Sequence, residues 1–169
     1  GAKVVANELD DTRVAHLKHQ LGEDNVHQEN AEQIGAILPP RGVKPTVVVM
    51  NPPFSQTAGR MGDKKDLMTG AKHISEALMT LQPGGRLVAI VGGGTQRGDA
   101  TRGAGMSPDS PTYKGWFADL AKKGYTLRAN VGVEGDEYKK HGTHFGTRTL
   151  IIDKVPDDGS KEVVTGNAE

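Results

Sequence analysis

Residues 46–54 read Thr-Val-Val-Val-Met-Asn-Pro-Pro-Phe, and they are the clearest indication of the fold. Its first five residues form an apolar, largely β-branched run that is typical of a buried strand. Proline cannot donate to a sheet ladder, so strand pairing must stop after Asn51, and the residue before each proline is held extended. The strand therefore ends in a stiff segment that carries the amide of Asn51, the carbonyl of Pro52 and the ring of Phe54. In open α/β sheets, ligands bind at this carboxyl edge.

The rest of the chain alternates between strand and helix patterns. Apolar runs predict strands over residues 3–7, 25–29, 46–50, 86–91, 125–133 and 147–155. Apolar residues at helical spacing predict helices within 11–21, 34–38, 67–81 and 113–121. This order predicts an α/β fold with a mostly parallel sheet that is covered on both faces. The last two strands, which have no helix between them, should form an antiparallel pair at its edge.

We expect a single domain over residues 1–155, followed by a polar, frayed tail over residues 156–169. Asp10 or Asp11 should cap the first helix, and Gly22 should end it. Trp116 and Phe117 lie at helical spacing with other apolar residues, which favours a place in the core.

Composition excludes several classes of function. Lys plus Arg equals Asp plus Glu at 21 each, so the chain lacks the overall positive charge of a typical nucleic-acid-binding module. The absence of cysteine excludes disulfides, thiolate zinc sites and cysteine nucleophiles. The histidine pairs His16/His19 and His141/His144 have no carboxylate or cysteine that would complete a site, so we predict no metal. Apolar runs of about five residues are far short of a membrane span, and we expect a soluble, cytoplasmic domain.

The segment after the strand suits one kind of chemistry. An exocyclic amine on a purine or pyrimidine is a poor nucleophile, because its lone pair is delocalised into the ring. Two acceptors placed against its N–H bonds, the Asn51 side-chain oxygen and the Pro52 carbonyl, would favour the tetrahedral, nucleophilic form. Pro53 has no N–H to compete, and stacking on Phe54 would contribute roughly 1–3 kcal/mol. The alternative interpretation is a turn that only ends the strand.

Asn51-Pro52-Pro53-Phe54 resembles the catalytic motif of class I S-adenosylmethionine-dependent amino-methyltransferases. The resemblance implies a Rossmann-like sheet and S-adenosylmethionine as the cofactor. In that family the motif accompanies methylation of adenine N6, cytosine N4, certain rRNA guanines or a glutamine amide. It implies direct methyl transfer to an amine, which in DNA would be flipped out of the base stack.

The resemblance also implies a set of cofactor-binding residues. Glu8 matches the acidic residue that binds the cofactor ribose hydroxyls, and Leu9 matches the apolar neighbour of the cofactor adenine. Asn30-Ala31 matches a position that usually reads Asp-Ala and contacts the adenine amine. Asn30 keeps the hydrogen-bonding side chain of that position and loses its charge.

Further details resemble one group within the family, the methylase domains attached to large helicase-like proteins related to strawberry notch. These occur in bacteria, plasmids and phages, and the resemblance favours DNA adenine as the substrate. It is carried by Asn-Pro-Pro-Phe-Ser at 51–55, Ala58-Gly59-Arg60, His73-Ile74, Tyr138-Lys139-Lys140-His141-Gly142-Thr143 and Thr147-Arg148.

The glycine-rich first motif of the family, which follows the central strand and holds the methionine part of the cofactor, has no match here. Gly92-Gly93-Gly94 follows a different strand. The missing strand would lie between residues 3–7 and 46–50, where every backbone group needs a partner. We therefore expect an upstream segment of the same polypeptide, about 30 residues in one strand–helix unit, to fill this place. Without it, cofactor should bind poorly or not at all.

Three polar stretches, residues 55–66, 92–111 and 134–146, should leave the same sheet edge and are candidates for contact with nucleic acid. Lys64-Lys65 and Lys139-Lys140 could contact phosphates there, or form an ordinary solvated surface. Two alternatives stay open. One is methylation of rRNA guanine or protein glutamine, and the other is a non-catalytic nucleic-acid-docking domain with a degenerate cofactor site.

Overall fold

The computed structural model describes residues 1–53, 56–57, 65–66, 68–92, 105–133, 146–156, 159 and 163–168. The main sheet has the strand order β3-β6-β8-β7-β9. Its strands are β3 (Val47–Met50), β6 (Arg86–Gly92), β7 (Thr126–Val133), β8 (Thr147–Asp153) and β9 (Val164–Ala168). A separate parallel pair consists of β1 (Ala6–Asn7) and β2 (Val26–His27). A small antiparallel pair consists of β4 (Gln56–Thr57) and β5 (Lys65–Asp66).

Strand directions agree with the predicted mixed sheet. β3 is parallel to β6, and β8 is antiparallel to both β6 and β7, which it separates. The α/β fold and the antiparallel pairing of the last two predicted strands are therefore confirmed.

The segment after Pro156 differs from the frayed tail that its polarity predicted. β9 pairs in parallel with β7, from Ala129 opposite Val164 to Val133 opposite Ala168. Backbone pairing needs no apolar side chain, so the open edge of β7 can order a polar segment. The edge strand on this side of the sheet is therefore β9. The antiparallel pair of β7 and β8, which was expected at the edge, lies inside it.

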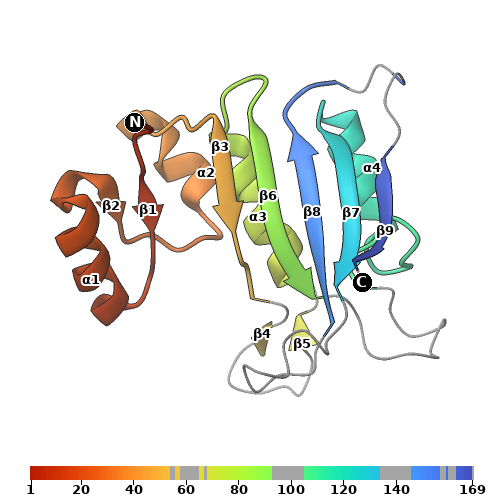
Figure 1. Ribbon diagram of the computed structural model, residues 1–169, viewed down its shortest axis with the longest axis horizontal. Helices are drawn as coiled ribbons and strands as arrows, with labels where there is room; N and C mark the ends of the chain where they lie inside the picture. The colour runs from red at the N-terminus through yellow and green to blue at the C-terminus, as the bar shows by residue number, and fades with distance from the viewer. Residues whose placement is uncertain are drawn as a thin grey trace.

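The helices of the main body lie on one face of the sheet. These are α2 (Ile34–Ile37), α3 (Thr69–Thr80) and α4 (Lys114–Lys122), with the short 3₁₀ helix η2 (Pro39–Arg41) after α2. In Figure 1, α3 and α4 lie behind the strands of the main sheet, and no described helix lies in front of them. The alternation of strands and helices predicted helices on both faces of the sheet. Among the described residues, helices cover one face of the main sheet.

The core lies between this face and its helices. It is built from alternate residues of β6 and β8 and from the apolar stripes of α3 and α4; its fully buried members include Ala71, Ile74, Leu78, Leu87, Ala89, Leu150 and Ile152. Phe117 is buried in this core, and Trp116 packs against it while donating a hydrogen bond to Ser75 Oγ at 2.9 Å. The predicted core role of Phe117 is confirmed, and Trp116 lies half-buried against the core.

The N-terminal part of the chain contains β1, β2 and one further helix. α1 (Asp11–Leu21) begins at Asp10, whose carboxylate accepts a hydrogen bond from the backbone N–H of Arg13 at 3.0 Å. It ends at Gly22, whose φ of 88° suits a residue without a side chain. The 3₁₀ helix η1 (Glu23–Asn25) then leads into β2. Asp10 is thus the cap, and Gly22 ends the helix as predicted.

The sheet is interrupted between these two parts. β1 pairs with β2, β3 pairs with β6, and no described strand connects β1 to β3. β1 and β2 are each two residues long, shorter than the runs 3–7 and 25–29 predicted, since a strand is defined by its pairing. Within the described residues, no helix has the length and apolarity that crossing a membrane requires.

Candidate active site

The candidate site lies at one edge of the sheet. Figure 1 shows β1, β3 and β6 running in the same direction, so their carboxyl ends share the lower edge of that view. Glu8 follows β1 directly, and Asn51 follows β3 directly. The fold thus places the predicted cofactor-binding carboxylate and the predicted catalytic amide at the same edge, as parallel strands require.

Asn51-Pro52-Pro53 leaves β3 between solvent and the core. Asn51 and Pro53 are exposed, and Pro52 is buried between them. The buried Pro52 ring anchors the segment, while the amide of Asn51 remains at the surface where a ligand can reach it. Phe54, the fourth predicted catalytic residue, lies outside the described residues.

The start of α3 packs directly against this segment. A Cβ atom added to Gly70 would lie 3.0 Å from the Pro53 carbonyl oxygen, 3.5 Å from Met106 Cε and 3.9 Å from Pro52 Cγ. Gly70 itself is buried. The missing side chain therefore permits the helix to approach the proline backbone and hold it in place. Sequence reasoning missed Gly70, because its only signal was a glycine near the start of an amphipathic helix.

Glu8 is held by its own chain. Its Oε1 accepts hydrogen bonds from the backbone N–H groups of Leu9 (2.8 Å) and Asp10 (3.0 Å), and its Oε2 pairs with Arg13 at 3.3 Å. The N–H of Asp10 chiefly lowers the pKa of the Glu8 carboxyl, with help from the N–H of Leu9 and the charge of Arg13, against the opposing effect of burial. The side chain is 25% exposed. Glu8 is therefore an oriented, ionised carboxylate that a ligand can reach.

A pair of hydrogen bonds joins the two predicted cofactor segments. Asn7 Nδ2 donates to the Glu29 carbonyl at 2.9 Å, and the Glu29 N–H donates to Asn7 Oδ1 at 3.1 Å. This places Asn30 next to the strand that carries Glu8. Asn30 is exposed, and its Oδ1 accepts from the Glu32 N–H at 2.9 Å, so it shapes a turn. Leu9 is exposed as well.

Ala31 is half-buried beside Asn30 in this turn. The structure thus brings Glu8, Leu9, Asn30 and Ala31 to one end of the β1–β2 pair. Asn7, which fixes their relation, was not predicted, since an amide at the end of a short apolar run gives no sign of its partner.

A buried polar network supports the same sheet edge from the other side. Arg148 Nε donates to Asn130 Oδ1 at 2.5 Å, and Asn130 Nδ2 donates to the Met106 carbonyl at 3.4 Å. Burial lowers the pKa of the Arg148 guanidinium, and the charge of Asp109 opposes this effect. Because Arg148 pairs with Val91 near the carboxyl end of β6, the network holds Met106 close to Gly70. In the sequence, the one sign of this network was the amide of Asn130 within a mainly apolar run. The structure shows that this amide is fully buried.

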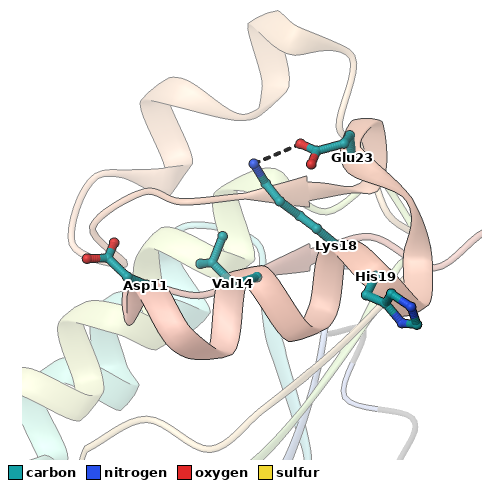
Figure 2. A pocket seen from close by; sticks show the side chains of 6 residues that line it. Asp11, Val14, Lys18, His19 and Glu23 are labelled. Atoms are coloured by element: carbon teal, nitrogen blue, oxygen red, sulfur yellow. Dashed lines mark ion pairs between the residues drawn. The ribbon is translucent and has the colours of Figure 1, made fainter.

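Two hollows on the described surface do not contain the predicted site residues. One runs along α1 and is lined by Asp11, Val14, Ala15, Lys18, His19 and Glu23, with Lys18 and Glu23 paired at 2.8 Å (Figure 2). Another is lined by Glu32, Met68, Lys72, Ser75, Glu76 and Trp116. Neither is lined by Asn51 or Glu8, so the candidate site is identified by the shared strand ends. The predicted nucleic-acid-contacting stretches lie largely outside the described residues.

No protein-family model matches this sequence, and no curated protein matches it either. Solved structures match the fold. A putative class I S-adenosylmethionine-dependent methyltransferase from Listeria monocytogenes is 16% identical, with a TM-score of 0.56 over 97% of this chain and 49% of that one. The M protein of the type I restriction enzyme EcoKI is 20% identical, with a TM-score of 0.54 over 89% of this chain and 31% of that one.

NSun6 from Pyrococcus horikoshii is 20% identical, with a TM-score of 0.51 over 92% of this chain and 42% of that one. The chain spans less than half the length of each of these three structures. It has the Rossmann-like fold of class I methyltransferases.

Proposed function

We propose that this chain is the catalytic part of an S-adenosylmethionine-dependent methyltransferase that methylates adenine N6 in DNA. The observation that carries the proposal is Asn51-Pro52-Pro53 at the carboxyl end of a parallel strand, fixed by the close approach of Gly70. A turn that merely ends a strand needs neither a buried Pro52 nor a glycine packed on the carbonyl of Pro53. Phe54 is proposed as the stacking residue.

The residues at the edge would act on the amine. Asn51 Oδ1 and the Pro52 carbonyl would each accept an N–H of the adenine amine, which concentrates its lone pair on nitrogen. Phe54 would stack on the flipped base. The amine nitrogen, cationic once methylated, would then release a proton to solvent. These residues bind and orient the amine, and no protein base is required.

The donor set on β1 fits a nucleoside ribose. Glu8 is ionised and oriented, and its Oε2 is engaged, among the described residues, by Arg13, whose own side chain is 71% exposed and free to move aside. Two ribose hydroxyls can donate to one carboxylate. Leu9, Asn30 and Ala31 would flank the adenine of the cofactor. S-adenosylmethionine, when bound, supplies the methyl group on a sulfonium.

DNA is proposed as the substrate on two grounds. Structural neighbours include the EcoKI M protein and a modification subunit of a putative type I restriction enzyme from Vibrio vulnificus. The resemblance to the methylase domains of strawberry-notch-related proteins points to the same substrate. Residues 55–66, 92–111 and 134–146 would contact the nucleic acid from the edge where Asn51 lies.

A second candidate is a nucleic-acid-docking domain without activity. The gap in the sheet between β1 and β3 favours this candidate, because no described strand lies between Glu8 and Asn51. We propose that an upstream segment of the same polypeptide restores that strand. Titrating cofactor into a polypeptide that includes this segment separates the candidates, since the docking domain would bind none.

Asn51→Ala tests the proposal in the same longer polypeptide. Transfer of a radiolabelled methyl group to adenine-containing DNA should be abolished, while cofactor affinity should stay within about twofold. Gln82→Ala is the matched control, because Gln82 is an exposed amide that precedes the amino end of β6, at the opposite edge of the sheet from Asn51. Full activity of the Asn51 variant would sink the assignment. Methyl incorporation into RNA or protein in place of DNA would indicate rRNA guanine or protein glutamine as the substrate.

A further inference from the structure

No described strand joins the two halves of the candidate site. β1, which ends before Glu8, pairs with β2, and β3, which ends before Asn51, pairs with β6. Among the described residues, the two halves are therefore related through the helices that pack beside the sheet. α3 contacts both of them, because its first turn approaches Pro53 at Gly70 and its side packs against α2.

One directed hydrogen bond joins α3 to α2. Glu76 Oε2 on α3 accepts a hydrogen bond from the backbone N–H of Gly35 at 2.9 Å, although the two residues lie 41 positions apart in the chain. Gly35 is in the first turn of α2, where backbone N–H groups have no partner within the helix. Gln33, the residue before α2, makes no capping bond with its side chain. Glu76 therefore provides from a distance the cap that α2 does not obtain from its own residues.

The backbone of α2 approaches α3 closely at this point. A Cβ atom added to Gly35 would lie 2.7 Å from Glu76 Oε2 and would overlap Met79 Cε. Ile34 and Leu38, on either side of Gly35, are buried in the core. Apolar burial has no preferred direction, so by itself it leaves a helix of four residues free to slide or rotate. The hydrogen bond from Gly35 to Glu76 adds the directed contact that fixes α2 in one position.

The turn that carries Asn30 and Ala31 is continuous with α2. The N–H of Gln33 donates to the Asn30 carbonyl at 2.9 Å, and the N–H of Ala36 donates to the Gln33 carbonyl at 3.1 Å. Turn and helix thus form one hydrogen-bonded unit. A contact that fixes α2 therefore also fixes the turn that contains the predicted adenine-binding residues.

A second polar pair between α3 and this turn is weaker. His73 Nε2 on α3 lies 4.0 Å from Glu32 Oε1. Burial chiefly lowers the pKa of the His73 imidazole, against the opposing charge of Glu32, so the ring is neutral at neutral pH. The pair then lacks the attraction of two opposite charges. The hydrogen bond from Gly35 to Glu76 is the stronger of these two links.

We infer that Glu76 is a positioning residue, which by capping α2 places the Asn30–Ala31 turn for the adenine of the cofactor. The same helix holds Pro53 through Gly70, about 9 Å from Glu76 along the helix axis, so α3 fixes the two halves of the site relative to each other. Glu76 acts through the backbone of Gly35 and is not itself a cofactor contact. The inference rests on the proposed function, because it assigns the Asn30–Ala31 turn to S-adenosylmethionine.

Hydrogen exchange measures the cap without any cofactor. In the full polypeptide, meaning this chain with its upstream segment, Glu76→Ala should speed exchange of the Gly35 amide at least about tenfold. Glu76→Gln keeps an oxygen that can accept the same bond, so its Gly35 amide should exchange within about twofold of the wild-type rate. Lys154→Ala is the matched control, since it removes hydrogen bonds to the Met79 and Leu81 carbonyls at the C-terminal end of α3. Unchanged exchange of Gly35 in Glu76→Ala would overturn the inference.

Cofactor affinity measures the positioning. Calorimetry should show S-adenosylmethionine binding about three- to tenfold weaker in Glu76→Ala, the range expected for one net hydrogen bond. Glu76→Gln and Lys154→Ala should stay within about twofold of wild type. A variant that is only less stable would bind with normal affinity and reduced stoichiometry, and a lower urea midpoint of Lys154→Ala with unchanged affinity would show this case. Equal loss of affinity in Lys154→Ala, or in Glu76→Gln, would contradict a role through the Gly35 bond.

The two measurements keep this inference separate from the proposed function. Normal wild-type binding together with wild-type affinity in Glu76→Ala would refute the positioning role alone. A wild-type polypeptide that binds no cofactor would refute the proposed function, and the positioning role with it. The exchange of Gly35 would still report whether Glu76 caps α2.

Discussion

Replacing Gly70 by alanine should separate positioning of the catalytic segment from stability of the fold. The new Cβ would lie 3.0 Å from the Pro53 carbonyl oxygen, which is tighter than ordinary van der Waals contact, so helix or loop must move by a few tenths of an ångström. A misplacement of about 1 Å costs about a hundredfold in rate, so this shift should cost about three- to tenfold. Alanine also favours the helix by up to about 1 kcal/mol, which offsets the strain in the free energy of unfolding.

The assay pairs two measurements on the full polypeptide: the rate of methyl transfer from radiolabelled cofactor to DNA, and the urea unfolding midpoint. Gly115→Ala in α4 is the control, because a Cβ there would meet nothing within 4 Å. The control should keep its rate and gain slightly in stability. An unchanged rate for the Gly70 variant would refute the view that α3 fixes the Pro53 backbone, and a large loss of stability would show that the contact is structural.

Three further predictions follow from charged and polar contacts. Asn130→Ala removes the acceptor of Arg148 and should lower the free energy of unfolding by about 1–3 kcal/mol, measured by urea titration. Asp153→Asn leaves Arg128 without its carboxylate and should cost about 3 kcal/mol at neutral pH. Hydrogen bonds, chiefly from Arg86, lower the pKa of the Asp153 carboxyl in the folded state. The stabilisation by Asp153 is therefore present at neutral pH and is lost as the pH falls through that lowered value. The Asn variant should lack this part of the dependence of stability on acid pH. Glu8→Gln should weaken cofactor binding in the full polypeptide about 10- to 100-fold by calorimetry, and wild-type affinity should stay level until the pH falls below the ordinary carboxyl value of 4.5.

The elements that the sequence predicted well are those whose cause is local. The apolar run of β3 and the prolines after it fix a strand and its end without help from the rest of the chain. Asp10 caps α1 through an N–H three residues away, and Gly22 ends the helix through its own backbone. The spacing of α3 likewise follows from its own residues.

The features that the sequence did not predict depend on distant partners. β9 forms because it pairs with the open edge of β7, and no pattern within Val164–Ala168 indicates that partner. Gly70 matters only because Pro53 comes within reach of its missing side chain. Asn130 was visible as a polar residue in an apolar strand, but its partner Arg148 follows from the strand register.

The place of β8 between β6 and β7 has a consequence for synthesis of the chain on the ribosome. β6 and β7 are made first, and neither can complete its ladder until β8 has emerged and inserted between them. Until β8 emerges, both strands therefore present unpaired edges. Ribosomes stalled just before Thr147 should therefore carry an aggregation-prone intermediate that binds chaperones.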